Sequence, residues 1–340
     1  RVVVVHNGII ENHAELRVEL EARGHAFQTE TDTETFALLV DDFLQAGHTP
    51  EAAAAAALKR VHGAFALAMI FAGHPELLIC ARQGAPLAVG FGEGEMFVGS
   101  DALALAPLTR RIAYLEEGDW AVLGRAGARF HDATGAEVVR DIKLTTVSGA
   151  TTGKGNYRHF MEKELHEHPV VLGDTLTQYL EPAQRRVVLP ELSFNPVTVP
   201  RLTMTACGSA YLAGLVGRYW IEELARLPVD ADVASEFRYR DPPLPDGGGA
   251  LLVSQSGETA DTMAALRLLK ERGQSVLSIV NVPESTMARE SDAAVLTVAG
   301  PEIGVASTKA FTAQLAVLAC LAIGLGRARG AISAAREAEL

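Results

Sequence analysis

Residues 250–262 read ALLVSQSGETADT, and this stretch decides the fold of the second half of the chain. The apolar residues 250–253 predict a short buried strand, and residues 261–273 have the spacing of a helix. A strand, a short polar loop and a helix in this order are typical of a parallel, doubly wound α/β sheet. In such sheets ligands bind at the loops that follow the strands.

The same rhythm of strand, loop and helix continues on both sides of this stretch. Other strands are expected at residues 202–206, 275–280 and 293–298, and helices at 211–227, 307–325 and 331–340. Residues 1–145 instead alternate helical stretches with short strands separated by Gly and Asp, which predicts an α+β domain with hairpins. Its expected strands are 2–5, 64–71, 77–81, 96–100, 111–115 and 120–123, and its helices are 12–24, 33–45 and 52–61.

Between these regions the composition changes. Residues 145–156 are rich in Thr, Ser and Gly, which predicts a linker. A polar helix is expected at 157–168, and Pro169 should stop it.

The bulk composition limits the possible functions. With 30 Lys and Arg against 42 Asp and Glu, the net charge is −12, which disfavours a nucleic-acid or anionic-membrane surface. The three cysteines, Cys80, Cys207 and Cys320, show no CxxC spacing, so we expect neither a disulfide scaffold nor a zinc ribbon, and a reducing cytoplasm fits. The apolar run at 315–325 is shorter than the ~20 residues that a bilayer requires, and no secretory signal is present.

The ends of the sequence suggest a fragment. Arg1 leads directly into an apolar strand with no initiator Met, and residues 331–340 stop inside a helical stretch. We therefore expect that the sequence is truncated at both ends.

Three loops that precede helices carry small and hydroxyl residues. Ser254, Gln255, Ser256 and Thr259 surround Gly257, with no Lys or Arg between 254 and 262, so a phosphate would be held by neutral donors and a helix N-terminus. An ordinary N-cap turn explains the same residues equally well. A second loop, Cys207, Gly208 and Ser209, is built alike, and Cys207 fits a buried apolar role better than a nucleophilic one. In the third loop, residues 302–309, Ser307 as N-cap accounts for the pattern.

In the first domain His6-Asn7-Gly8 follows the opening strand. Asn-Gly between apolar runs favours a hairpin turn. The alternative is an oxyanion hole, made by the Asn7 amide and the Gly8 N–H. Thr31 to Glu34 matches a capping box, and Asp32 inside it can also meet a ligand ammonium group.

His159, His166 and His168 lie among glutamates and invite a metal interpretation. No HExxH spacing occurs, so a solvated helix between the domains is the better interpretation.

Taken together, five stretches resemble one family. HNGIIEN (6–12), ETDTE (30–34), ASEFRYR (234–240), SQSGETADT (254–262) and EIGVASTKAF (302–311) occur in this order. They resemble the glutamine–fructose-6-phosphate aminotransferase (isomerizing) family, also called glucosamine-6-phosphate synthase. The resemblance extends over essentially all 340 residues, including GSDALAL (99–105) and YRHFMEKE (157–164).

The resemblance implies a class II glutamine amidotransferase domain with an N-terminal-nucleophile fold at 1–145, an interdomain linker and helix at 146–190, and a first sugar-isomerase (SIS) domain at 191–340. The second SIS domain would be absent. By this likeness Asn7 and Gly8 form the oxyanion hole and Asp32 binds the α-amino group of glutamine. The residues expected to bind the sugar phosphate are Cys207, Gly208, Ser209, Ser254, Gln255, Ser256, Thr259 and Val305.

The implied reaction makes glucosamine 6-phosphate and glutamate from fructose 6-phosphate and glutamine, with no redox or metal cofactor. The implied partners are these small molecules and a second copy of the chain, joined through the SIS domains. The family's cysteine nucleophile would lie before Arg1 and its isomerising groups after Leu340, so the fragment alone is expected to be inactive. Many members read Cys-Gly-Thr-Ser where residues 207–210 of this chain read Cys-Gly-Ser-Ala. The phosphate would lose one hydroxyl donor at Ala210, which is worth about 0.5–1.5 kcal/mol of binding free energy.

Two other functions are compatible with parts of the sequence. A sugar-phosphate sensor would use a SIS domain alone, but it would not need the HNG and TDTE motifs. Another class II amidotransferase would keep those motifs but would carry a pyrophosphate or ATP site in place of SQSGET.

Overall fold

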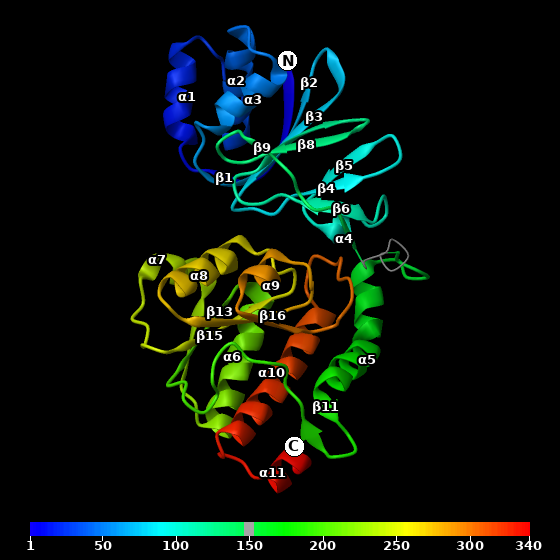
Figure 1. Ribbon diagram of the computed structural model, residues 1–340, viewed down its shortest axis with the longest axis vertical. Coiled ribbons are helices and arrows are strands. Elements are labelled where there is room, and N and C mark those ends of the chain that lie inside the picture. Colours follow the sequence, from blue (N-terminus) through cyan, green and yellow to red (C-terminus); the bar gives the residue numbers. More distant parts are fainter. Residues whose placement is uncertain (146–152) are drawn as a thin grey trace. The chain divides into compact units, whose positions relative to one another are not determined.

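The computed structural model describes residues 1–145 and 153–340. The chain forms two compact units, Arg1–Gly153 and Lys154–Leu340 (Figure 1). Most of the expected linker, residues 146–152, lies outside the described residues. The domain boundaries expected near residues 145 and 190 stay predictions.

Unit 1 contains two antiparallel sheets. The larger has the order β1-β2-β3-β7-β8-β9 and the smaller β10-β6-β4-β5. The strands of the larger are β1 (Val2–Ile10), β2 (Gly63–Phe71), β3 (His74–Gln83), β7 (Trp120–Gly124), β8 (Gly127–His131) and β9 (Glu137–Val138). The smaller contains β4 (Ala88–Phe91), β5 (Met96–Gly99), β6 (Arg111–Tyr114) and β10 (Lys143–Leu144), and the helices are α1 (His13–Ala22), α2 (Asp32–Gln45), α3 (Pro50–Leu58) and the short α4 (Ala102–Leu105).

The larger sheet of unit 1 is covered on both faces. On one face Leu67 and Met69 of β2 pack with Phe36 and Leu39 of α2 in a single buried cluster. On the other face a second cluster joins strands of both sheets. Helices therefore cover one side of the larger sheet and the smaller sheet covers the other, as expected for an α+β unit.

Strand β1 contradicts the hairpin-turn interpretation of Asn7-Gly8. The strand runs without interruption from Val2 to Ile10, and Asn7 and Gly8 pair with Ala66 and Phe65 of β2. The chain does not turn until it has passed Ile10. The hairpin prediction was wrong because the short apolar run on either side of Asn-Gly belongs to one long strand.

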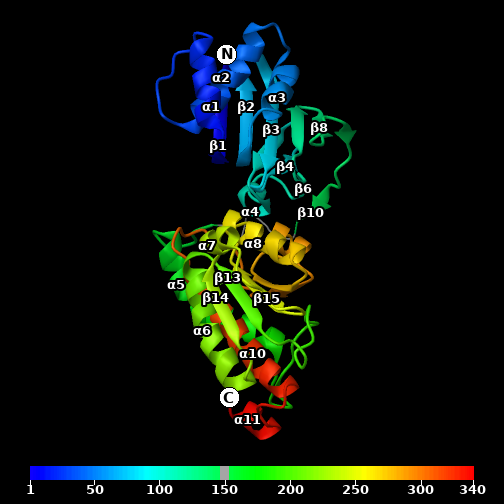
Figure 2. The same ribbon diagram turned by 90° about the vertical axis from the view of Figure 1, so that its left-hand side faces the viewer.

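Unit 2 contains a five-stranded sheet in which every pair of strands is parallel. The order is β14-β13-β15-β16-β17, and Figure 2 labels β14, β13 and β15 of this sheet. The strands are β13 (Leu202–Ala206), β14 (Val229–Val233), β15 (Gly249–Ser254), β16 (Ser275–Val280) and β17 (Ala293–Leu296). Strands β13 and β16 have the predicted bounds, whereas β14, with its alternating acids VDADV, was not predicted.

Side chains alternate between two helical layers along each strand of this sheet. Leu251 and Leu277 face a cluster with α6 (Gly208–Ala225) and α10 (Lys309–Ala328). Their neighbours Leu252 and Val276 face α7 (Ala234–Arg240), α8 (Ala260–Glu271) and α9 (Thr286–Glu290). Both faces of the sheet are thus buried under helices, which is the doubly wound α/β arrangement (Figure 1).

Helix α5 (Phe160–Tyr179) contradicts the prediction that Pro169 ends a helix at residue 168. Pro169 and Leu165, whose carbonyl loses its helical donor, are both exposed, so water can satisfy that carbonyl. Beyond the proline, Thr175 and the Tyr179 hydroxyl donate to the carbonyls of Thr297 and Leu296 at the end of β17. These buried contacts hold the second half of the helix against the sheet. The short strands β11 (Leu180–Glu181) and β12 (Arg186–Val187) follow, and helix α11 (Ala334–Glu339) ends the unit.

One helix in the described residues, Lys309–Ala328, is long and apolar enough to cross a membrane. It lies in the core of unit 2, and 67% of its most apolar window is buried. The helix belongs to the layer of helices that packs on one face of the five-stranded sheet.

Candidate functional site

The strand order of unit 2 marks where a ligand binds. From β13 the chain moves to β14 on one side and then returns to β15 on the other, so the winding direction reverses between β13 and β15. These two strands are hydrogen-bonded neighbours with Ala206 opposite Val253. Loops 207–209 and 254–259 therefore leave the same edge of the sheet side by side. In doubly wound sheets this switch point is the usual ligand site.

The helices that follow these two loops begin without a side-chain cap. Within the described residues, no cap hydrogen bond is made by Cys207, the N-cap of α6, or by Thr259, the N-cap of α8. In the same described part of the chain, α1, α5 and α7 also lack such a bond, whereas α2, α3, α9 and α11 each have a Ser or Thr hydroxyl that accepts one. Two long helices thus direct N–H groups and the positive end of their dipoles at one place, which suits an anion.

Hydroxyl groups of the 254–259 loop organise its backbone. The buried Ser254 Oγ accepts the Gly257 N–H at 3.0 Å and lies 3.2 Å from Thr259 Oγ1. Ser256 Oγ accepts the Glu258 N–H at 3.1 Å. Gly257 has φ +66°, and a side chain there would collide with Ser285. The loop is a tight turn that leaves the half-buried Ser256 hydroxyl available to donate, and the Thr259 hydroxyl is available as well when Ser254 is the donor of their shared bond.

On the neighbouring loop, Cys207 and Ser209 are half-buried and Gly208 is exposed. The Cys207 sulfur accepts a weak hydrogen bond from Thr262 Oγ1, 3.8 Å away on α8. This contact links the start of α8 to the loop after β13. Ala210 is buried, so its side chain packs in the core rather than facing the loop.

The third loop, between β17 and α10, is built differently. The N-cap of α10 is Thr308, whereas the sequence suggested Ser307. The Glu302 carboxylate accepts the N–H groups of Thr308 at 2.8 Å and Ala310 at 3.1 Å, together with the Ser307 hydroxyl. A carboxylate therefore already occupies this helix N-terminus, and it would repel a second anion. Val305 stands at the loop tip with a fully exposed side chain.

Asn281, which follows β16, connects these loops. Its backbone N–H donates to the Gln255 carbonyl at 3.1 Å. Its nearly buried side chain accepts from the Thr297 hydroxyl and the Ala299 N–H, and donates to the Gly300 carbonyl at 2.7 Å. The 254–259 loop and the segment that leads to Glu302 are thus fixed to one another. In the sequence, Asn281 is marked only as a polar residue that directly follows a buried strand.

In unit 1 the second predicted site lies on an edge strand. β1 has β2 on one side and no strand on the other among the described residues. Asp32, the first residue of α2, accepts the Ile10 N–H at 2.9 Å through Oδ2. In a regular strand the N–H groups of residues 8 and 10 point to the same side, about 6.6–6.8 Å apart. The Gly8 N–H and the Asp32 carboxylate therefore lie along one edge, while the Asn7 side chain is exposed.

His6 holds the start of α2 against the same strand. Its side chain is almost completely buried, and Nδ1 lies 2.9 Å from Thr33 Oγ1 and 3.6 Å from Asp32 Oδ1. Burial lowers the pKa of His6 below its ordinary value of 6.5, and the Asp32 charge opposes this only in part. The sequence interpretation treated His6 as part of a motif and gave it no role of its own.

Thr31 caps α2 as predicted, because its hydroxyl accepts the Glu34 N–H at 3.4 Å. The Glu34 carboxylate does not return to Thr31. It accepts the N–H groups of Gln28 and Thr29 instead, at 2.8 and 2.7 Å, and so closes the loop ahead of the helix.

A groove of about 380 Å³ in unit 2 lies at the other end of α10, beside Leu189, Phe194 and Arg327. Its lining is mostly apolar, and Arg327 is engaged with Glu337 and the Ile332 carbonyl. It lacks the convergent free donors of the switch point.

The histidines of α5 do not form a metal site in the described part of the chain, where no three His, Cys, Asp or Glu side chains converge. His166 stacks on Tyr157, and His168 Nδ1 lies 3.1 Å from Thr312 Oγ1.

Comparison with known proteins agrees with this division of the chain. Residues 1–107 match the glutamine amidotransferase domain family, and residues 198–324 match the SIS domain family. The chain is 62% identical over 340 residues to the glutamine–fructose-6-phosphate aminotransferase [isomerizing] of Gluconobacter oxydans, and 55% identical over 339 residues to that of Zymomonas mobilis. The chain is thus similar over its whole length to members of the glutamine–fructose-6-phosphate aminotransferase family, and it contains matches to both domain families.

Against both relatives the alignment covers the whole chain but only 56% of the relative, so the chain spans about half their length. A solved structure, the C-terminal domain of glucosamine-fructose-6-phosphate aminotransferase from Francisella tularensis, superposes with a TM-score of 0.52 at 38% identity, over 55% of this chain and 53% of that one. Unit 1 thus contains the match to the glutamine amidotransferase domain family, and unit 2 contains the match to the SIS domain family on a parallel sheet.

The buried, neutral His6 predicts a pH dependence of stability. Since its folded-state pKa lies below 6.5, the unfolded chain binds the proton more readily. Its contribution is fully present above pH 6.5 and is lost as the pH falls from 6.5 through the folded-state pKa. We expect His6→Asn to flatten the dependence of the unfolding free energy of unit 1 on pH between 7 and 5.

The measurement is urea unfolding at a series of pH values, followed by Trp120 fluorescence in a Trp220→Phe background, because these two tryptophans lie in different units. The exposed His74, changed to Asn, is the matched control. The same pH slope in His6→Asn and in the unchanged background protein would contradict the prediction.

Proposed function

We propose that the protein takes part in converting D-fructose 6-phosphate and L-glutamine to D-glucosamine 6-phosphate and L-glutamate. The observation that carries the proposal is the pair of uncapped helix N-termini at the β13/β15 switch point of unit 2. They belong to the same chain as an amidotransferase unit. The relatives that align with its whole length, at 62% and 55% identity, are named for this reaction.

In the proposed sugar-phosphate site the phosphate binds to the two loops after β13 and β15. The loop after β17 stands beside the sugar through Val305. Two features support this arrangement: donors converge at the first two loops, and the Glu302 carboxylate blocks the third helix N-terminus. The contributing residues would be Ser209, Ser254, Gln255, Ser256 and Thr259, with the backbone of Cys207 and Gly208.

In the proposed glutamine site Asp32 binds the α-ammonium group, and the Asn7 amide and Gly8 N–H stabilise the oxyanion formed when the side-chain amide is attacked. The ammonia released would condense with the keto group of the sugar, with loss of one water, to form an imine. A ketose-to-aldose rearrangement, in which a proton moves from C1 to C2, would then complete the amino sugar. The spacing of Gly8 and Asp32 along one strand edge suits the length of a glutamine side chain. Cys80 does not fit the role of nucleophile, since complete burial raises the pKa of its thiol to about 12.

The phosphate site is tested by the double variant Ser256→Ala, Thr259→Ala. Each hydroxyl would donate to a charged group, and one such bond is worth about 1.5–3 kcal/mol. We expect the affinity for fructose 6-phosphate to fall at least about tenfold. The measurement is calorimetric or NMR titration of the 340-residue chain.

Ser275→Ala is the matched control, because Ser275 lies at the opposite end of the sheet, at the start of β16. An unchanged affinity in the double variant would rule out this site.

The oxyanion role is tested by Asn7→Ala in the full-length gene product that contains this chain. Removal of one oxyanion donor costs roughly 10²–10³ in turnover. We therefore expect glutamate release from glutamine to fall by about that factor, with fructose 6-phosphate affinity and melting temperature little changed, because the Asn7 side chain is exposed.

Asn12→Ala supplies the structural comparison. The Asn12 side chain donates to the Arg60 carbonyl and accepts the His62 N–H, so its loss should lower the melting temperature but not the turnover of the folded enzyme. If Asn7→Ala behaved like Asn12→Ala, Asn7 would be structural.

We also propose that two copies of the chain associate through unit 2. Leu212 and Tyr219 are two turns apart on α6, and their side chains are 56% and 69% exposed. A second copy would cover this apolar face, and Tyr219→Arg should then shift the protein from dimer to monomer in sedimentation equilibrium. A monomeric unchanged protein would contradict the proposal.

A cytoplasmic location is proposed from the three free cysteines and is checked by cell fractionation.

A further inference from the structure

The loop between β17 and α10 is held at both ends by buried carboxylates. Glu302, within the loop, binds the start of α10, and Glu164, far away in sequence on α5, binds the loop at Ile303 and Gly304. We propose that Glu164 is a positioning residue that fixes Val305 against the sugar part of the bound sugar phosphate. This inference rests on the proposed function and extends the site to a helix that precedes the SIS domain.

The contacts of Glu164 are specific. Its side chain is 1% exposed. Its Oε1 accepts the Ile303 N–H at 2.6 Å and the Gly304 N–H at 3.0 Å, and Oε2 lies 3.2 Å from the same Gly304 nitrogen. A side chain at residue 304 would collide with Oε2, so glycine leaves the space that the carboxylate occupies. Burial of a carboxylate is costly unless it is well hydrogen-bonded, and here backbone donors supply that compensation.

The residue between the two anchors makes little packing contact. Val305 is fully exposed and Ala306 is exposed as well. Two buried carboxylates thus fix a segment whose tip adds little to the core. A loop that is held rigidly but presents an uncovered apolar side chain is suited to contact a ligand. Asn281 links this loop to the 254–259 loop, because it bonds to the carbonyls of both Gly300 and Gln255.

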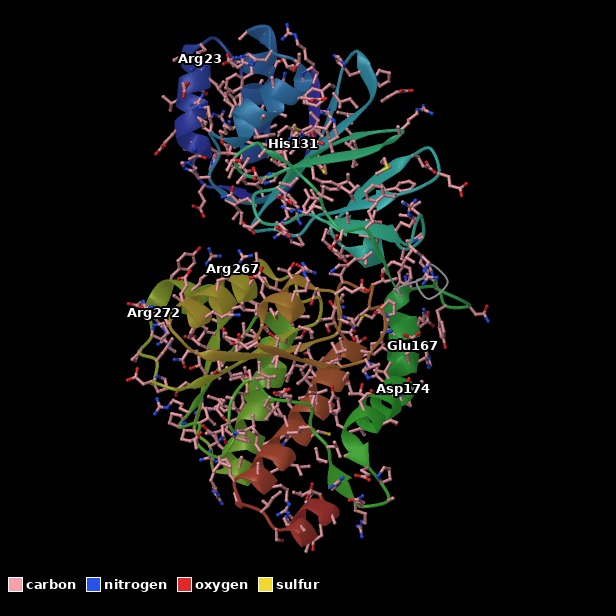
Figure 3. The ribbon with its side chains drawn as sticks, in the orientation of Figure 1. Arg23, His131, Glu167, Asp174, Arg267 and Arg272 are labelled. Carbon is pink, nitrogen blue, oxygen red and sulfur yellow. The ribbon has the colours of Figure 1, made fainter. Side chains whose placement is uncertain are left out.

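Helix α5 contacts α10 through other residues too. Glu167 Oε2 accepts from the buried Lys309 Nζ at 2.6 Å, and His168 lies beside Thr312. Figure 3 labels Glu167 on α5, which runs along α10. Because these contacts do not involve residues 303–304, α5 should stay in place when Glu164 is changed. The effect of Glu164 on the loop can therefore be separated from the packing of the helix.

Glu164→Gln keeps the size of the side chain but replaces one acceptor oxygen with an NH₂ group, which opposes the N–H groups of the loop. We expect the affinity for fructose 6-phosphate to fall about three- to tenfold. The affinity for inorganic phosphate, which would touch only the loops after β13 and β15, should stay within a factor of two. A purely structural role would lower both affinities together.

The experiment titrates the 340-residue chain with fructose 6-phosphate and with inorganic phosphate by calorimetry. Glu167→Gln, which loses the ion pair with Lys309, and Glu162→Gln, which removes an exposed charge of the same helix, are the controls. The sugar-selective loss in Glu164→Gln alone supports the proposal. Unchanged affinities, or a parallel loss for both ligands, overturn it.

Two further variants protect the conclusion. If Glu164→Gln fails to fold, Glu164→Asp takes its place, because it keeps the charge but has a shorter side chain. Glu164→Asp should give the same sugar-selective loss of affinity. Equal losses for both ligands would again overturn the inference. The Ser256→Ala, Thr259→Ala variant separates the two hypotheses. If it binds both ligands as tightly as the unchanged chain, the proposed phosphate site fails; if it loses both while Glu164→Gln loses neither, only the role of Glu164 fails.

Discussion

The parallel pairing of β13 with β15 is the constraint on which the candidate site depends. Parallel strands end at the same edge, so the pairing of Ala206 with Val253 brings together two loops that are almost fifty residues apart in sequence. The pairing is secured by burial on both faces, where Leu251 and Leu252 point into different helical layers. A shift of β15 by one residue would exchange these faces and would displace one loop from the other by about 3.3 Å.

The chain carries a net charge of −12, yet unit 2 has a site suited to an anion. The conflict is resolved locally, through the assignment of backbone N–H groups. At α6 and α8 the first N–H groups have no side-chain acceptor in the described residues, and so they can bind a ligand. At α10 the corresponding groups are used by Glu302, and nearby ones are used by Glu164. An anion can therefore bind at the N-termini of α6 and α8 rather than at that of α10, although the 254–259 loop contains no lysine or arginine.

Much of this arrangement could be predicted from the sequence. The apolar runs 202–206 and 275–280 gave the bounds of β13 and β16, because strands buried on both faces are continuous in hydrophobicity. β14 was missed because VDADV alternates acidic residues with small and apolar ones. Asn7-Gly8 and Pro169 misled local interpretation, since pairing with β2 and the bonds of Thr175 and Tyr179 to β17 outweigh their local preferences. The contact between Glu164 and Gly304 spans 140 residues, and no local pattern encodes it.

The carboxylate at the start of α10 gives the proposed sugar-phosphate site a polarity. The loops after β13 and β15 offer hydrogen-bond donors, whereas the loop after β17 already contains a negative charge of its own. A molecule with a phosphate at one end therefore has a single favourable orientation, and the reversed one would place two anions together. In the proposed site, this charge would set which end of an elongated substrate faces the loop tip, independently of any contact with the sugar.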